Sequence, residues 1–267
     1  MEEETFNLDP NEVLKKITPK TKAILPVDLY GQIHDYEAIS KIAKEYNLKV
    51  LEDACQAVNA ELNGKKAGCF GDIAAFSFYA TKNMITGEGG MIVTNNDDYA
   101  ELARRFRHHG QSEKTRYEYY HLGYNYRMMD LQAAIGLEQL KKIEDFTQKR
   151  IRNAQKLIDG LQKIPRIKVP TIKNEAKHVF HQFTIKVKPE VRDLLVNYLK
   201  EQGISCGIYY PKALHLFPPF AKLGYKAGDF PVAERLSKEV ISLPVHPALT
   251  EEEIDYMIKK IGEFKCR

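Results

Sequence analysis

The 267-residue sequence lacks a long apolar run, an export signal and a large excess of charge of either sign. No segment approaches the roughly 18 consecutive apolar residues of a membrane-spanning helix, and the first four residues (MEEE) are acidic rather than basic and apolar. The 40 basic and 36 acidic side chains are interspersed, which disfavours nucleic acid as a partner. We therefore expect a cytoplasmic protein that binds neither membrane nor nucleic acid.

Cysteine is also scarce, and metal-binding spacings are missing. The four cysteines lie far apart with no C-x-x-C pair, which favours free thiols over a disulfide framework or a zinc ribbon; they are Cys55, Cys69, Cys206 and Cys266. The histidines at 108–109, and those at 178 and 181, have no matching carboxylates. We expect them to be surface or packing residues, and we predict no metal site.

The first half of the chain alternates short apolar runs with helical periodicity. Strand candidates cover residues 22–29, 49–55, 73–79 and 91–94, with helices over 39–46 and from about 95 to Gly110. Residues 117–129 have no clean period and predict an irregular loop. Near-continuous apolar strands alternating with helices predict an α/β fold, with a mostly parallel sheet buried on both faces.

The second half is of a different kind. A single long helix is expected over residues 130–160, followed by a half-buried strand over 182–187 and a helix over 191–198. Thr250 and Glu253 form a capping box before the last helix. The predicted organisation is therefore a large domain (1–129), a connecting helix (130–160) and a smaller C-terminal α+β domain (161–267).

Reactive side chains follow two neighbouring predicted strands. Asp53 ends one run, Ser77 ends the next, and Lys82 lies in the loop that follows. The carboxyl ends of parallel strands meet at one sheet edge, so a carboxylate, a hydroxyl and an amine should lie close together. Pyridoxal 5'-phosphate needs such a set: an amine for a Schiff base, an acid for its ring nitrogen, and polar groups for its phosphate.

Two other interpretations stay open for these residues. A single loop lysine is usually a solvated surface charge. Glu52 and Asp53 could equally be the magnesium-binding acidic pair of a nucleotide hydrolase. Such an enzyme would be expected to carry a phosphate loop, and the motif G-x-x-x-x-G-K-[ST] is absent.

Several separate motifs, in order, resemble those of the pyridoxal-phosphate-dependent nucleotide-sugar aminotransferases (the DegT/DnrJ/StrS family). The two most specific are residues 52–57 (EDACQA) and 77–90 (SFYATKNMITGEGG). The others are 26–32 (PVDLYGQ), 123–128 (GYNYRM), 209–215 (YYPKALH) and 243–247 (LPVHP). The resemblance covers essentially the whole chain and implies a three-layer fold of the type I pyridoxal-phosphate transferase kind.

The resemblance also implies roles for individual residues. Lys82 matches the lysine that binds the cofactor covalently and moves a proton, and Asp53 matches the acid beside the ring nitrogen. Gln56 matches a residue near the ring hydroxyl, and Ser77 a phosphate ligand. Asn125 resembles a residue that reaches the cofactor phosphate of a neighbouring subunit, which implies a homodimer with shared sites. Tyr209 and His215 lie in a motif near the substrate, with no role assigned.

The implied activity is transfer of an amino group, with glutamate as donor, to a keto-sugar nucleotide in amino-sugar or surface-polysaccharide biosynthesis. Two departures bear on it. Asp28 stands where the family commonly has His, and residues 1–10 resemble an interior stretch of the family. The sequence is therefore expected to be N-terminally truncated, and two explanations stay open: the chain acts with a separately encoded N-terminal half, or it is an incomplete reading frame of a longer enzyme. The alternative is a catalytically silent homologue that acts as an interaction or regulatory module.

Overall fold

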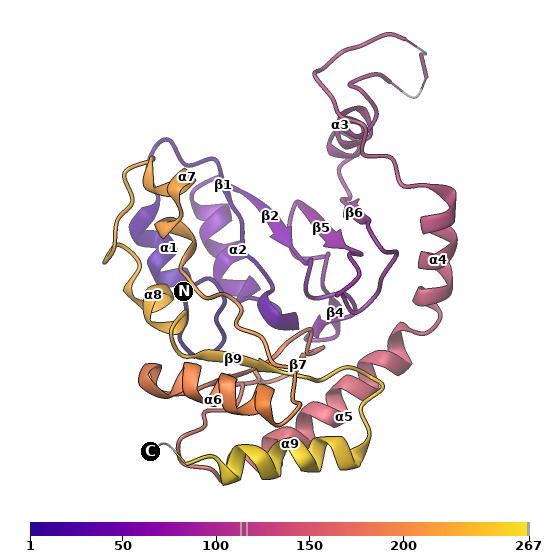
Figure 1. The fold of residues 1–267 in the computed structure, drawn as a ribbon. Coiled ribbons are helices and arrows are strands. Elements are labelled where there is room, and N and C mark those ends of the chain that lie inside the picture. The colour runs from indigo at the N-terminus through magenta and orange to yellow at the C-terminus, as the bar shows by residue number, and fades with distance from the viewer. Residues whose placement is uncertain (113, 116, 266–267) are drawn as a thin grey trace. The chain divides into compact units, whose positions relative to one another are not determined.

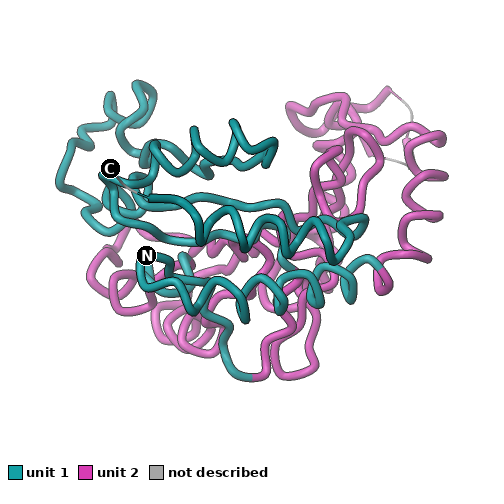
Figure 2. Tube along the Cα trace, turned by 60° about the horizontal axis from the view of Figure 1, so that its bottom comes forward, with its two compact units in different colours: residues 1–6, 146–174, 180–267 teal, residues 7–145, 175–179 magenta. Residues whose placement is uncertain are grey.

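A computed structural model describes residues 1–112, 114–115 and 117–265, which form two compact units (Figures 1 and 2). The sheet unit comprises residues 7–145 and 175–179. The helical unit comprises residues 1–6, 146–174 and 180–267. The expected free thiol of Cys266 lies outside the described residues.

A four-stranded sheet in the order β1-β2-β5-β6 forms the centre of the sheet unit. Its strands are β1 (Ala23–Ile24), β2 (Lys49–Asp53), β5 (Ile73–Ser77) and β6 (Gly90–Val93). The first three are parallel and β6 is antiparallel to β5, which confirms the predicted α/β fold with a mostly parallel sheet. β1 is shorter than the apolar run that predicted it because Pro26, two residues on, has no N–H for the ladder.

The helices of the sheet unit begin where polar caps stand in the sequence. Asp35 accepts a hydrogen bond from the N–H of Ala38 at the start of α2 (Tyr36–Glu45), and Asn96 accepts one from Tyr99 at the start of α3 (Asp97–Arg107). Ile39 and Ile42 of α2 belong to one buried cluster with side chains of β1 and β2. Burial of this apolar stripe holds α2 to the sheet. Figure 1 shows α2 beside β1 and β2.

Several short elements of the sheet unit carry no periodic signal, and the sequence did not predict them. β3 (Glu61–Leu62) pairs with β4 (Lys65–Lys66) and with β7 (Ala176–Lys177), a distant part of the chain. Two-residue strands are too short to show alternation. The remaining elements are α1 (Pro10–Lys16), the 3-10 turn η1 (Leu29–Gly31) and α4 (Asp130–Leu140).

The sheet is not covered on both faces at β6. Met91 and Ile92 are 52% and 54% exposed. The expectation of burial on both faces is therefore wrong for this strand within the described residues.

The single helix expected over residues 130–160 is broken. α4 ends at Leu140 and α5 (Ile143–Leu161) begins after Lys141 and Lys142, where the N–H of Lys142 bonds to the carbonyl of Gln139. The break places Ile143 in a buried cluster with Phe78 and Met84. Because the apolar periodicity continues on both sides of the break, the sequence predicts one helix.

The helical unit packs α5, α6 (Pro189–Glu201) and α9 (Glu251–Glu263) around the antiparallel pair β8 (Phe183–Lys186) and β9 (Val240–Leu243). The predicted capping box at Thr250 and Glu253 is present. The unit also contains η2 (Leu214–Leu216), α7 (Pro218–Ala221) and α8 (Pro231–Leu236). Within the described residues, no helix has the length and apolar character needed to cross a membrane.

β8 differs from its prediction as a half-buried strand, since all four of its residues are buried. The hydroxyls of Thr184 and Ser242 bond to each other at 2.8 Å, and Lys186 Nζ donates to the carbonyl of Glu3 at 2.9 Å and lies over the ring of Phe6. The polar side chains of β8 therefore find hydrogen-bond partners inside the unit, and the first six residues supply one of these partners.

Candidate active site

Asp53 lies at the carboxyl end of β2, as predicted. Its backbone N–H bonds to Pro26 O and its carbonyl accepts from the N–H of Asp28, which fixes it between two strands. Its Oδ1 accepts from the N–H of Cys55 at 3.0 Å, and its side chain is half-buried. The carboxylate is thus held in place while part of it stays accessible.

Lys82 lies close to the same strand end, because its charge acts on the thiol of Cys55. Burial raises the pKa of the Cys55 thiol to about 12, with a further rise from its hydrogen bond to Asp53. The positive charge of Lys82 acts on the same thiol in the opposite direction, so the amine lies within electrostatic reach of it. One thiol therefore interacts with both the amine and the carboxylate singled out in the sequence, so the two groups lie in the same neighbourhood.

A hydrogen-bonded turn carries Lys82 after β5. Ser77 ends that strand and its Oγ accepts from the N–H of Tyr79 at 3.4 Å. The Lys82 N–H bonds to the Tyr79 carbonyl, and the neighbouring Asn83 is buried and donates to the carbonyl of Val179 at 3.0 Å. Asp53 pairs with Ala75 in the sheet register, so Ser77 and Asp53 end adjacent parallel strands.

Gln56 follows β2 and contacts the segment after β1. Its Oε1 accepts from the backbone N–H of Tyr30 at 2.8 Å. Tyr30 has a left-handed φ of 60° and is followed by Gly31 at 104°. The turn through these two residues brings the segment after β1 back to the end of β2.

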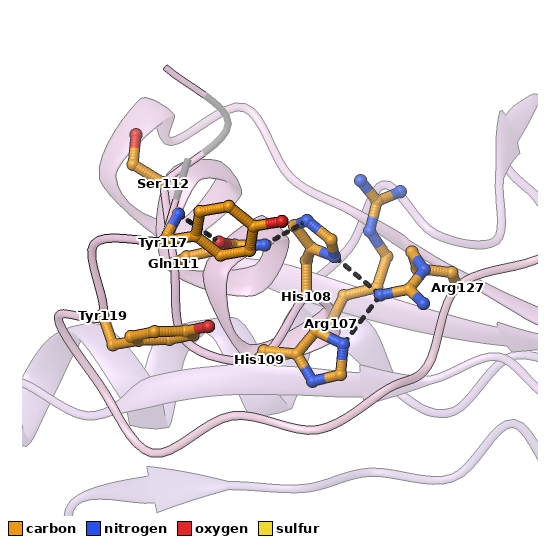
Figure 3. A pocket seen from close by; sticks show the side chains of 8 residues that line it. All are labelled: Arg107, His108, His109, Gln111, Ser112, Tyr117, Tyr119 and Arg127. Atoms are coloured by element: carbon orange, nitrogen blue, oxygen red, sulfur yellow. Dashed lines mark hydrogen bonds between the residues drawn. The ribbon is translucent and has the colours of Figure 1, made fainter. Parts of the chain in front are cut away.

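Asn125 is exposed in the segment after α3, where it pairs with His108 in an isolated antiparallel bridge. The adjoining pocket, of about 770 Å³, is lined by two arginines, two histidines and two tyrosines (Figure 3). Arg127 Nη1 lies 2.8 Å from His108 Nδ1 and 3.0 Å from His109 Nε2. These histidines contact the segment after α3 that carries Asn125 and Arg127, which agrees with the packing role predicted for them.

Tyr209 and His215 belong to the helical unit. His215 is buried and its Nε2 lies 3.0 Å from Glu234 Oε1. Glu234 also accepts from the N–H groups of Gly228 and Phe230. The observed contacts of His215 therefore order the segment between η2 and α8, while Tyr209 is 39% exposed.

Asp28, His34 and Glu52 form a buried polar cluster that the sequence patterns do not predict. Asp28 Oδ1 accepts from the N–H of His34 at 3.0 Å and lies 2.6 Å from His34 Nδ1. Glu52 accepts from the backbone N–H groups of Gly68, Phe70 and Gly71. Burial and the neighbouring Asp28 raise the pKa of Glu52 to about 7. The unusual Asp28 was the one available signal for this cluster.

The cluster removes the acidic-pair interpretation. Glu52 is fully buried while Asp53 is half-buried at the strand end, because successive side chains of β2 alternate between faces. The two carboxylates therefore do not form one acidic pair. Among the described residues, no group of three His, Cys, Asp or Glu side chains could hold a metal ion.

Comparison with known proteins identifies the family. Residues 1–262 match the profile of the DegT/DnrJ/EryC1/StrS aminotransferase family. The chain belongs to this family. Family members are pyridoxal-phosphate-dependent aminotransferases, and the α/β fold predicted from the resemblance is confirmed.

Individual relatives support the assignment. A "Pleiotropic regulatory protein" of Geobacillus stearothermophilus is 47% identical over 265 residues, which are 97% of this chain and 70% of that protein. A GDP-perosamine synthase of Caulobacter vibrioides is 40% identical over 264 residues, again 97% and 70% of the two chains. The chain thus spans about 70% of the length of these relatives.

Solved structures agree. S. venezuelae DesV, in complex with a ketimine intermediate, superposes with a TM-score of 0.93 at 35% identity over 98% of this chain and 70% of DesV. The protein Spr1654 of Streptococcus pneumoniae, in its PLP-form, has a TM-score of 0.90 at 27% identity, over 98% of this chain and 73% of that one. The side chains that follow β2 and β5 suit pyridoxal phosphate, since Lys82 offers an amine and Asp53 a carboxylate, and both act on the thiol of Cys55.

Proposed function

We propose that this chain catalyses pyridoxal-phosphate-dependent transfer of an amino group from glutamate to a keto group of a nucleotide-linked sugar. The observation that carries the proposal is the interaction of Cys55 with both Lys82 and Asp53. We further propose that the protein works in the cytoplasm as a homodimer, in which Asn125 reaches the neighbouring subunit's site.

Each proposed residue has a defined task. The cofactor, when bound, supplies an electron-accepting ring. Lys82 Nζ would hold it covalently and, once released, carry a proton to and from the substrate carbon. Asp53 would keep the ring nitrogen protonated, because a carboxylate favours a positive charge beside it. Gln56 and Ser77 would orient the ring hydroxyl and the phosphate.

The test is covalent trapping at Lys82. The purified protein is mixed with pyridoxal phosphate, reduced with borohydride and digested, and the labelled peptide is identified by mass spectrometry. We expect the label on Lys82, and a loss of more than about 100-fold in amino transfer for Lys82→Ala, because covalent catalysis and proton transfer both depend on this amine.

A matched control is Lys41→Ala, because Lys41 is an exposed lysine on α2 of the same unit. This variant should be labelled like the unmodified protein. Labelling at another lysine would refute the assignment of Lys82 as the residue that binds the cofactor. So would an absorption spectrum of Lys82→Ala with cofactor that matches the spectrum of the unmodified protein.

A regulatory role is the second candidate, favoured by the name of the 47% identical relative. A silent regulatory module would bind no pyridoxal phosphate and transfer no nitrogen. The same trapping experiment separates the two functions, because a protein with no label at any lysine would support the module.

A further inference from the structure

We propose that Asp28 and Glu52 hold one proton between them and that this pair positions Asp53, so that loss of the proton above neutral pH weakens the cofactor site. The part that concerns the cofactor rests on the proposed function. Both residues act on Asp53 through the backbone, so both are positioning residues.

The geometry requires a proton in this cluster. Asp28 and Glu52 are both 0% exposed, and their side chains are hydrogen-bonding neighbours. One Asp28 oxygen, Oδ1, is used by His34, while Oδ2 is buried and receives no hydrogen bond from any N–H or hydroxyl among the described residues. Two carboxylates without a proton would repel each other there, whereas one shared proton gives the buried oxygen a donor.

The surroundings offer little other charge to stabilise a second anion. From the segment after β1, His34 faces Asp28, and from the loop before β5 backbone N–H groups donate to Glu52. Lys65 of β4 lies over the ring of Phe70, 4.7 Å from its centroid. His178, beside Gly31, is buried, which lowers its pKa to about 3 and keeps it neutral.

The pair is tied to Asp53 through the backbone on both sides. The N–H of Asp28 donates to the carbonyl of Asp53 at 3.0 Å, and Glu52 precedes Asp53 in β2. Glu52 also holds the loop at 68–71, which leads directly into β5 and so to Ser77. A second negative charge in the pair would push the two carboxylates apart. This would strain the backbone bond from Asp28 to Asp53 and the hydrogen bonds from the loop at 68–71 to Glu52.

The sign of the pH dependence follows from the folded and unfolded proton affinities. An ordinary Glu releases its proton near its usual pKa of 4.5, whereas folded Glu52 keeps it until about 7. The folded state therefore binds more protons between these values, so the stabilisation is complete below 4.5 and is lost as pH rises to 7. The unfolding midpoint should fall across this window.

The first experiment is infrared spectroscopy of the protein without cofactor, followed through neutral pH. We expect a carbonyl band of a protonated carboxylic acid that disappears as pH rises through about 7. Glu52→Gln should lack the band and keep the fold, because its amide can donate to Asp28 and accept from the loop. Asp28→Asn should lack it too, because its amide can donate to an ionised Glu52.

The second experiment measures the dissociation constant for pyridoxal phosphate at about pH 6 and about pH 8.5. In the unmodified protein the dissociation constant should be larger at about pH 8.5 than at about pH 6. The ratio of the two constants should be several-fold smaller in Glu52→Gln and Asp28→Asn. Glu45→Gln, an exposed carboxylate at the end of α2, is the matched control and should behave like the unmodified protein.

The outcomes separate the two proposals. A missing infrared band in the unmodified protein, or a band that persists in both variants, overturns the shared proton. A band that titrates as expected while the ratio of the constants is the same in all proteins overturns the positioning role. Failure of every protein to bind pyridoxal phosphate refutes the proposed function, and the infrared result still decides the shared proton.

Discussion

At the scale of single residues, Cys55 reports on the proposed site without taking part in the chemistry. Its thiol is half-buried, donates towards the carbonyl of Ala75 at 3.6 Å and interacts with Asp53. A thiol in this environment is a poor nucleophile, because only the thiolate reacts. Any movement of Asp53 should therefore change the reactivity of Cys55.

We predict slow alkylation of Cys55. With its pKa raised from 9.0 to about 12, it should hold on the order of 1000-fold less thiolate than an ordinary thiol at neutral to mildly alkaline pH. Iodoacetamide should modify the exposed Cys69 much faster. Peptide mapping by mass spectrometry over a time course measures both rates.

Asp53→Asn is the control for this prediction. It removes a charge that raises the pKa of Cys55, so alkylation of Cys55 should accelerate while that of Cys69 stays the same. Equal rates for Cys55 and Cys69 in the unmodified protein would contradict the buried environment of Cys55.

At the scale of elements, glycines in two helices of the helical unit have opposite surroundings. A Cβ at Gly160 in α5 would lie 2.6–2.9 Å from three side-chain atoms of Ile258. A Cβ at Gly262 in α9 would meet only Ile164, at 3.9 Å. Close approach of α5 and α9 therefore needs glycine at 160 and not at 262.

We predict opposite effects of alanine at these positions. Gly160→Ala should lower the free energy of unfolding by about 1–2 kcal/mol, since overpacking outweighs the gain in helix propensity. Gly262→Ala should raise it by about 0.5–1 kcal/mol, since the propensity gain meets no clash. Denaturant unfolding measures both, and destabilisation by both variants to the same extent would contradict the packing described.

Elements with strong local signals were predictable from the sequence. The helix expected from about residue 95 begins at the cap Asn96, and Thr250 caps the last helix as expected. The apolar runs that became β2, β5 and β6 lie in one sheet. The break at Lys141 was not predictable, because burial of Ile143 among side chains distant in sequence decides it. The burial of Lys186 also depends on residues 1–6, which are distant in sequence.

The site was predictable to a similar extent. Asp53, Ser77 and Lys82 stand at strand ends that simple topology brings together. The partners of Asp28 could not be predicted, because the contacts with His34 and Glu52 arise from a turn through Tyr30 and Gly31 that has no periodic signal. Residues that act only by positioning other residues show no characteristic spacing in the sequence.

At the scale of the whole molecule, exposed apolar side chains at β6 bear on association. β6 is an edge strand of the four-stranded sheet, and Met91 and Ile92 are more than half exposed. Apolar side chains beside the unpaired backbone groups of an edge strand favour contact with another chain.

We predict that Ile92→Glu reduces concentration-dependent self-association of this chain and changes the free energy of unfolding by less than about 0.5 kcal/mol, because the side chain is exposed. Sedimentation velocity over a range of concentrations measures association. Leu194→Glu, on a helix of the other unit and 49% exposed, is the matched control and should leave association unchanged. Equal effects of the two variants would show that β6 has no special role.

The chain enters the sheet unit after residue 6, leaves it after residue 145 and returns for residues 175–179. A single cut in the gene therefore cannot yield the two units as separate, complete polypeptides. For the same reason, a recombination at one boundary cannot exchange one whole unit for another.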